Sequence, residues 1–143
     1  MSKKSIYLAI KEALKGKLPD LFIDLQKGQF LKPSENLPVP LPAVLVEFNN
    51  IPWAEHSRIS QKGDATFTVH LYQEALQSTF DESEAESDTL DMLNANSEVF
   101  KTINGLQGDD FSYVERKSEG KPQYGDGWVK FSTDFKINII EEY

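Results

Sequence analysis

The chain has 143 residues, a formal net charge of −8 at pH 7 and no cysteine. This length suits one domain, 1–143, with a sizeable core, and the missing cysteines exclude disulfides, thiolate metal sites and cysteine nucleophiles. The acidic charge disfavours binding to nucleic-acid phosphates, and no apolar run approaches the roughly 20 residues of a membrane span. We therefore expect neither sequence-specific nucleic acid nor a membrane as a partner.

The N-terminal region is predicted to form a helix and then a short strand. Its apolar residues recur three and four positions apart, and Gly16 and Pro19 are expected to end the helix. Residues 21–25 alternate in the manner of a strand that ends near Lys27-Gly28. The prolines of residues 33–42 predict an extended connection within the same domain. The helical pattern consists of Ile6, Ala9, Ile10, Ala13 and Leu14.

Two strands are predicted in the middle of the chain. Residues 43–48 form an apolar run typical of a strand covered on both faces, and residues 64–74 alternate between apolar and polar side chains. We expect these two strands to pair antiparallel. The connection between them, residues 49–63, is predicted to be a loop of a length that is often functional, and it carries Trp53, His56 and Arg58.

A second helix is expected after a run of acidic residues. Ser87 or Asp88 can cap its N-terminus and Gly105 can end it. Phe111 and Tyr113 are expected to begin a further strand, and residues 120–127 have the composition of a hairpin connection. The apolar stripe assigned to the helix is Leu90, Leu93, Ser97, Phe100 and Ile103, with Met92, Ala95 and Val99 on its flank.

The last stretch, residues 128–143, has the clearest pattern, because apolar and polar residues alternate with period two. Strands grouped in runs predict an α+β fold: a mostly antiparallel or mixed sheet of about five strands, with two helices packed on one side. The apolar parity of the last strand consists of Val129, Phe131, Thr133, Phe135, Ile137 and Ile139.

Few residues point to chemistry. The two histidines, His56 and His70, lack the spacing of a metal motif, and the phosphate-binding glycine loops and the GxSxG motif are missing. Asp109-Asp110 reads as a turn. We expect His70 to be a hydrogen-bonded structural histidine and His56 a contact residue. The sequence thus predicts a protein that is not an enzyme and that has no cofactor and no metal site.

Candidate interface residues come from loops and from the acidic run. Aromatic residues near loops can anchor an interface, although a tryptophan that covers the end of a sheet gives the same pattern. The acids between residues 81 and 91 could meet the lysines before residue 18 in another copy, although solvated acidic runs are more common. The candidates are Trp53, His56, Arg58, Asp81, Glu82, Glu84, Glu86, Tyr124 and Trp128.

The order of these elements resembles one protein family. An amphipathic helix, the segments LPAVLVEF, GDATFTVHLYQE and DTLDMLNANSEVFKTING, and the closing GWVKFSTDFKINI together resemble the tail terminator, or tail completion, proteins of long-tailed bacteriophages and prophages. The resemblance implies a hexameric ring that caps the tail tube, ends its polymerisation and contributes to head-tail joining. It implies tail tube and head-tail connector proteins as partners, and a place in the virion tail after assembly in the bacterial cytoplasm.

Two other functions stay open at this point. The chain could be a small protein-binding adaptor that uses the 49–63 loop as a monomer or dimer. It could also be an enzyme of unfamiliar type that uses Asp109, Asp110, His56 or His70.

Overall fold

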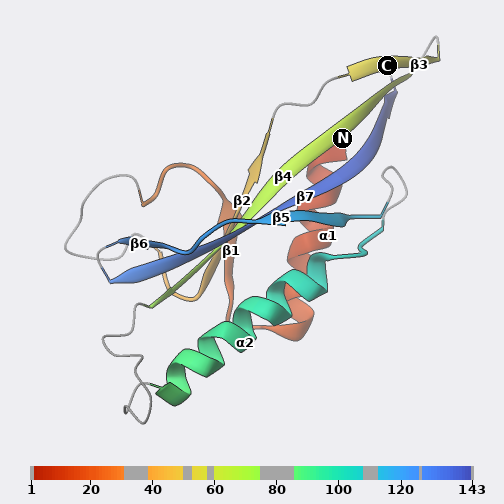
Figure 1. The fold of residues 1–143 in the computed structure, drawn as a ribbon. Coiled ribbons are helices and arrows are strands. Elements are labelled where there is room, and N and C mark those ends of the chain that lie inside the picture. The colour runs from red at the N-terminus through yellow and green to blue at the C-terminus, as the bar shows by residue number, and fades with distance from the viewer. Residues whose placement is uncertain are drawn as a thin grey trace.

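A computed structural model describes residues 2–30, 39–49, 53–57, 60–74, 86–107, 113–125 and 127–142. These residues form two helices and one sheet of seven strands (Figure 1). The elements are α1 (Ser2–Lys17), β1 (Phe22–Leu25), β2 (Ala43–Phe48), β3 (Trp53–Ser57), β4 (Ser60–Glu74), α2 (Glu86–Ile103), β5 (Glu115–Glu119), β6 (Gln123–Gly125) and β7 (Trp128–Glu142).

The strand order β1-β2-β4-β7-β5 makes the sheet mixed. β1 and β2 are parallel, and the other pairs are antiparallel, including the predicted pairing of β2 with β4. β4 and β7 pair along their whole length, from Ser60 opposite Glu142 to Glu74 opposite Trp128. The predicted α+β class with a mostly antiparallel or mixed sheet is confirmed, with more strands than the five expected.

Both helices pack on one side of the sheet, as predicted (Figure 1). The apolar parity of β7 faces them, so Phe135 is fully buried between Phe67 of β4 and Phe100 of α2. In α1 the buried positions Ile6, Ile10 and Leu14 are four residues apart, as an amphipathic helix requires. These contacts form the main core.

The helix boundaries and the stripe of α2 need three corrections. α2 begins at Glu86, so Ser87 and Asp88, the residues expected to cap it, lie inside the helix. Gly16 lies inside α1, which continues to Lys17, and the Leu18 amide still donates to the Leu14 carbonyl at 2.7 Å. In α2 the flank residue Val99 is buried, while Leu93 is 48% exposed. Leu93 shares a face with Phe100 but lies two turns earlier in the helix, and it does not belong to the core cluster. Gly105, with a φ of +90°, follows the end of α2 as predicted.

Two predicted loops contain strands. Residues 53–57 of the expected 49–63 loop form β3, which folds back on the start of β4 with Trp53 opposite Gly63. The strand that starts at Ser60 is longer than the alternation from residue 64 indicated, and it supplies the edge on which β3 pairs. In the 120–127 connection, β6 pairs with the start of β7.

Gly125 ends β6 at a position that has no room for a side chain. A Cβ at this position would lie 2.1 Å from the Trp128 ring. The strand expected from Phe111 and Tyr113 begins at Glu115, and Phe111, Asp109 and Asp110 lie outside the described residues. No helix in the described part of the chain is long and apolar enough to cross a membrane.

Candidate interaction surface

The side of the sheet opposite the helices carries polar side chains that form hydrogen bonds across the strands. We call this side the outer face. Its residues alternate with the core residues of β2, β4 and β7, because successive strand residues point to opposite sides. The outer face consists of Ala43, Leu45 and Glu47 of β2, Thr66, Thr68, His70 and Tyr72 of β4, and Lys130, Ser132, Asp134 and Lys136 of β7.

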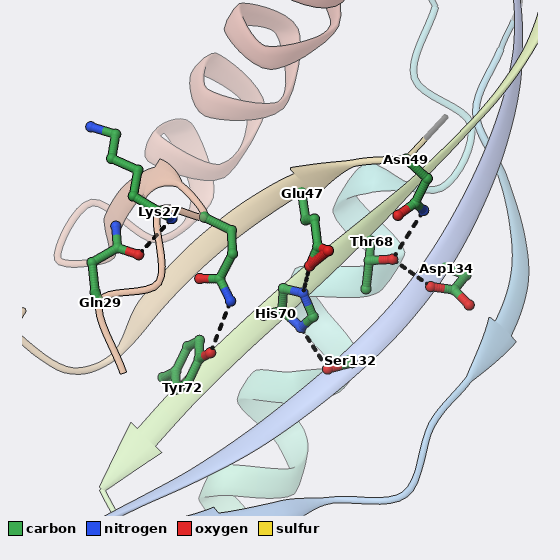
Figure 2. Close-up of polar contacts among 10 residues, drawn as sticks. Lys27, Gln29, Glu47, Asn49, Thr68, His70, Tyr72, Ser132 and Asp134 are labelled. Carbon is green, nitrogen blue, oxygen red and sulfur yellow. Dashed lines mark hydrogen bonds and ion pairs between the residues drawn. The ribbon is translucent and has the colours of Figure 1, made fainter. Parts of the chain in front are cut away.

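A row of three polar side chains crosses β2, β4 and β7 at His70 (Figure 2). His70 Nδ1 lies 2.7 Å from Ser132 Oγ, and His70 Nε2 lies 2.9 Å from Glu47 Oε1. A carboxylate can only accept hydrogen bonds, so Nε2–H of the neutral ring donates to Glu47 and Nδ1 accepts from the Ser132 hydroxyl. The predicted hydrogen-bonded role of His70 is confirmed, and Glu47 and Ser132 are its partners.

Burial lowers the pKa of His70 below its ordinary 6.5. The hydrogen bond to Glu47 opposes this shift, the positive charge of Lys130 adds to it, and the negative charge of Asp134 works against it. The imidazole side chain is only 9% exposed, whereas that of Glu47 is 46% exposed. His70 is therefore neutral at pH 7, and Glu47 remains accessible from solvent beside it.

We expect the stabilising contribution of His70 to depend on pH. Because its pKa is lower in the folded than in the unfolded chain, the unfolded chain binds more protons just below pH 6.5. The contribution is complete above pH 6.5 and is lost as the pH falls through the folded pKa. Urea unfolding at pH 7.5 should show His70→Asn to be less stable than the wild type by about 1–3 kcal/mol, and this difference should shrink at pH 5.

His56→Asn is the matched control for this measurement, since it removes the other histidine. A His70→Asn difference that stays constant from pH 7.5 to pH 5 would contradict the assignment.

A second polar row runs parallel to the first and reaches a fourth strand. Thr68 Oγ1 donates to Asp134 Oδ1 at 2.6 Å, and Ser118 Oγ of β5 donates to Asp134 Oδ2 at 3.1 Å. Asn49 Nδ2, just after β2, donates to Thr68 Oγ1 at 3.4 Å (Figure 2). Both oxygens of the Asp134 carboxylate are thus held in place.

An open pocket of about 540 Å³ is lined by residues of β4, β7 and β5 and by Tyr113 just before β5. Its lining includes Thr66, Tyr113, Lys117 and the ion pair between Lys136 and Glu115, whose charged atoms are 3.2 Å apart. The hydrogen bond from Tyr113 is the largest cause, ahead of Lys136, of the lowered pKa of Glu115. Glu115 and Lys136 are therefore paired with each other within the pocket, beside the side chain of Lys117.

The other end of the outer face is aromatic and covered. The ring of Tyr72 is stacked on Phe30 with centroids 4.0 Å apart and meets Trp128 edge-on at 5.3 Å. Val39 and Leu41 pack against the same cluster. Phe30, Val39 and Leu41 thus cover this end of the outer face, whereas the hydrogen bonds of the two polar rows are only partly buried.

The row of Glu47, His70 and Ser132 has the hydrogen-bond order of an acid, a base and a nucleophile. Acyl transfer also needs donors for the oxyanion, and the backbone around Ser132 is paired with β4 on one side and with β5 or β6 on the other. The pocket lies beside β5, away from this row. What the described residues show is a row of hydrogen-bonded side chains held in order across three strands.

The structure separates the sequence-predicted candidates. Trp53 and His56 lie in β3, beside the start of β4, whereas Trp128 pairs with its end. Tyr124 is 75% exposed in β6, next to Trp128, whose ring packs against Tyr72. Glu86 begins α2. The candidates outside the described residues are Arg58, Asp81, Glu82 and Glu84.

Sequence reasoning singled out His70 but missed the other residues that form the two rows. Ser132 and Asp134 do occupy the polar parity of the last strand, but the register that brings them opposite His70 and Thr68 is a property of the folded sheet. Among the described residues, no three histidine or acidic side chains are placed to hold a metal ion.

The comparisons with known proteins add no relative. No protein-family model matches the chain, and no curated protein matches it. The resemblance to tail terminators remains an expectation, and the functional argument rests on the fold and the outer face.

Proposed function

We propose that this protein is a structural subunit that assembles through its faces into a ring, and that the ring caps the tail tube of a long-tailed phage or prophage. The observation that carries the proposal is the outer face: two polar rows, hydrogen-bonded across the strands and only partly buried. Side chains fixed in this way lose little entropy when a partner binds.

The edge strand β1 is closed to strand addition, which supports assembly through faces. The amides of Phe22 and Gln26 donate hydrogen bonds toward β2, and backbone groups alternate in direction along a strand, so those of Leu21, Ile23 and Leu25 point outward. The three outward carbonyls accept hydrogen bonds from side chains: Leu21 from Lys15 Nζ, Ile23 from the Tyr7 hydroxyl at 3.5 Å and Leu25 from Gln29 Nε2 at 3.0 Å.

The opposite edge, β5, is protected by other means. Its register shifts between Arg116 and Ser118, and the Arg116 amide donates to Asn104 Oδ1 at 2.9 Å. Arg116 also forms an ion pair with Glu119 at 2.7 Å. Irregularity and charge at an edge disfavour the addition of another strand. At β1 and β5, the two ends of the main strand order, open-ended sheet growth is therefore disfavoured, which suits a closed assembly.

The ring function is tested by adding the purified chain to tail tube protein during polymerisation. A cap stops growth because it covers the end that the next tube subunit would join. We expect short tubes of limited length, with a density at one end in electron micrographs. Light scattering should give six times 16.2 kDa, about 97 kDa, for the hexamer that the resemblance implies.

Bovine serum albumin at equal concentration is the control for the tube experiment. Tubes that grow to the same length with and without the chain, and carry no end density, would rule out the capping role.

An adaptor is the second candidate function, and the β3–β4 hairpin favours it. Part of the expected 49–63 loop is an ordered strand, paired from Trp53 opposite Gly63 to Ser57 opposite Ser60. Such a hairpin could present a strand to a peptide partner. The adaptor predicts a monomer or dimer with no effect on tube length, so the same two measurements separate the two functions.

A further inference from the structure

α1 concentrates positive charge in an acidic protein. It contains five lysines and one glutamate, hence a net charge of +4 in a chain of −8, so the rest of the chain carries −12. Such separation favours contact between the helix of one copy and an acidic surface of another.

Two of the exposed lysines lie on one side of α1 with an exposed leucine between them. Lys4, Leu8 and Lys11 are spaced four and three residues apart, and so they share one side of α1. The two lysines are exposed, and Leu8 between them is 49% exposed, which is unusual for a large apolar side chain. Lys15 continues the stripe, but its ammonium is held by the Leu21 carbonyl. We call Lys4, Leu8 and Lys11 the α1 stripe.

The outer face offers two carboxylates that match the stripe. Glu47 and Asp134 lie on either side of Thr68, directly opposite it on β2 and β7. Hydrogen bonds from His70, and from Thr68 and Ser118, hold both carboxylates in position. The cations of this face are engaged nearby, Lys136 with Glu115 and Lys130 over the Tyr72 ring at 6.0 Å.

The spacings of the two surfaces agree. Strands lie about 4.8 Å apart, so residues on β2 and β7, with β4 between them, are separated by about 10 Å. Lys4 and Lys11 are seven residues apart, which is also about 10 Å along a helix. A helix that crosses the strands could therefore place each lysine at one carboxylate and Leu8 over Thr68.

We propose that the α1 stripe of one copy docks on Glu47, Thr68 and Asp134 of a second copy. This inference rests on the proposed ring function and names the contact that builds the ring. The stripe and the outer face lie on opposite layers of the subunit (Figure 1). Each copy then gives one surface and receives the other, and such head-to-tail contacts generate rings when the rotation closes.

Charge reversal on α1 tests the electrostatic part of the contact. We expect Lys4→Glu/Lys11→Glu to weaken self-association at least about tenfold in sedimentation velocity. Lys3→Glu/Lys17→Glu is the matched control, because it makes the same charge change on exposed positions of the same helix outside the stripe, and it should leave self-association unchanged. Equal loss in both variants, or no loss in either, overturns the role of the stripe.

Disulfide trapping tests on which surface the α1 stripe docks. Because the chain has no cysteine, the introduced cysteines are the only thiols that can form the disulfide. Mixing the single variants Leu8→Cys and Thr68→Cys under mild oxidation should give a mixed covalent dimer on a non-reducing gel. Leu8→Cys mixed with Tyr124→Cys, an exposed position elsewhere, should give much less of it. Circular dichroism of each variant confirms that it is folded.

The outcomes separate this inference from the ring function. If Lys4→Glu/Lys11→Glu loses self-association but Thr68→Cys is not trapped, the α1 stripe does not dock on the outer face. Other acidic residues, such as those between 81 and 91, would then be its binding partners. A wild-type chain that stays monomeric and is not trapped overturns self-docking. Tube capping is measured separately, so it can succeed or fail whichever contact builds the ring.

Discussion

Replacing Phe135 with alanine is expected to lower the free energy of unfolding by about 3–5 kcal/mol. The ring is fully buried and joins the sheet to a helix, with its centroid 5.5 Å from Phe67 and 6.2 Å from Phe100. The lost apolar contacts and the cavity left in a rigid core act together. Since small domains are stable by about 5–15 kcal/mol, this single change should shift the urea midpoint strongly.

The matched control is Tyr124→Ala, which removes an aromatic ring that is 75% exposed. Its effect should stay within about 0.5 kcal/mol when both variants unfold in urea at low protein concentration. A loss for Phe135→Ala below about 1 kcal/mol would mean that the core is not packed as described.

The second large effect is expected at Tyr72, in the aromatic cluster on the outer face. Tyr72→Ala should cost about 3 kcal/mol or more, because the ring is 1% exposed and lies against Phe30 and Trp128. The substitution also removes the surface on which Val39 and Leu41 pack. Limited proteolysis should then cut between β1 and β2 faster than in the wild type.

Tyr72→Phe separates the ring from its hydroxyl group. The hydroxyl has a long hydrogen bond, 3.5 Å from Gln26 Nε2, so its removal should cost less than about 1 kcal/mol. If Tyr72→Phe is as unstable as Tyr72→Ala, the hydroxyl and not the ring stack is responsible.

The regular elements could be predicted because their patterns are local. The period-two alternation of residues 128–143 identified β7 and its buried face, and the spacing of Ile6, Ile10 and Leu14 identified α1. The pairing of β2 with β4 could be predicted because an apolar run at residues 43–48 and an alternating pattern at residues 64–74 indicated two successive strands.

The elements that sequence reasoning missed depend on tertiary pairing. β3 contains Ala54, Glu55 and His56, which show no strand pattern, and it becomes a strand because the long β4 offers an edge. The exposure of Leu93 likewise depends on how far along α2 the core contacts extend, and helical spacing alone does not indicate this.

The contacts on the outer face could not be predicted from the sequence for a related reason. His70, Glu47 and Ser132 are far apart in sequence, and only the registers of β4 with β2 and with β7 bring them together. The polar parity of a strand indicates which residues face away from the core, but it does not indicate their partners. The sequence could therefore indicate which residues lie on this face of the sheet, but not which of them contact one another.

The long ladder between β4 and β7 also determines when the chain can fold. β7 lies between β4 and β5 in the sheet but follows both of them in the sequence, so this part of the sheet cannot form until residues 128–142 have been synthesised. Until then the inner edge of β4 has no partner, and contacts between distant segments form slowly. During this stage the unpaired edge of β4 is open to incorrect pairing with other strands.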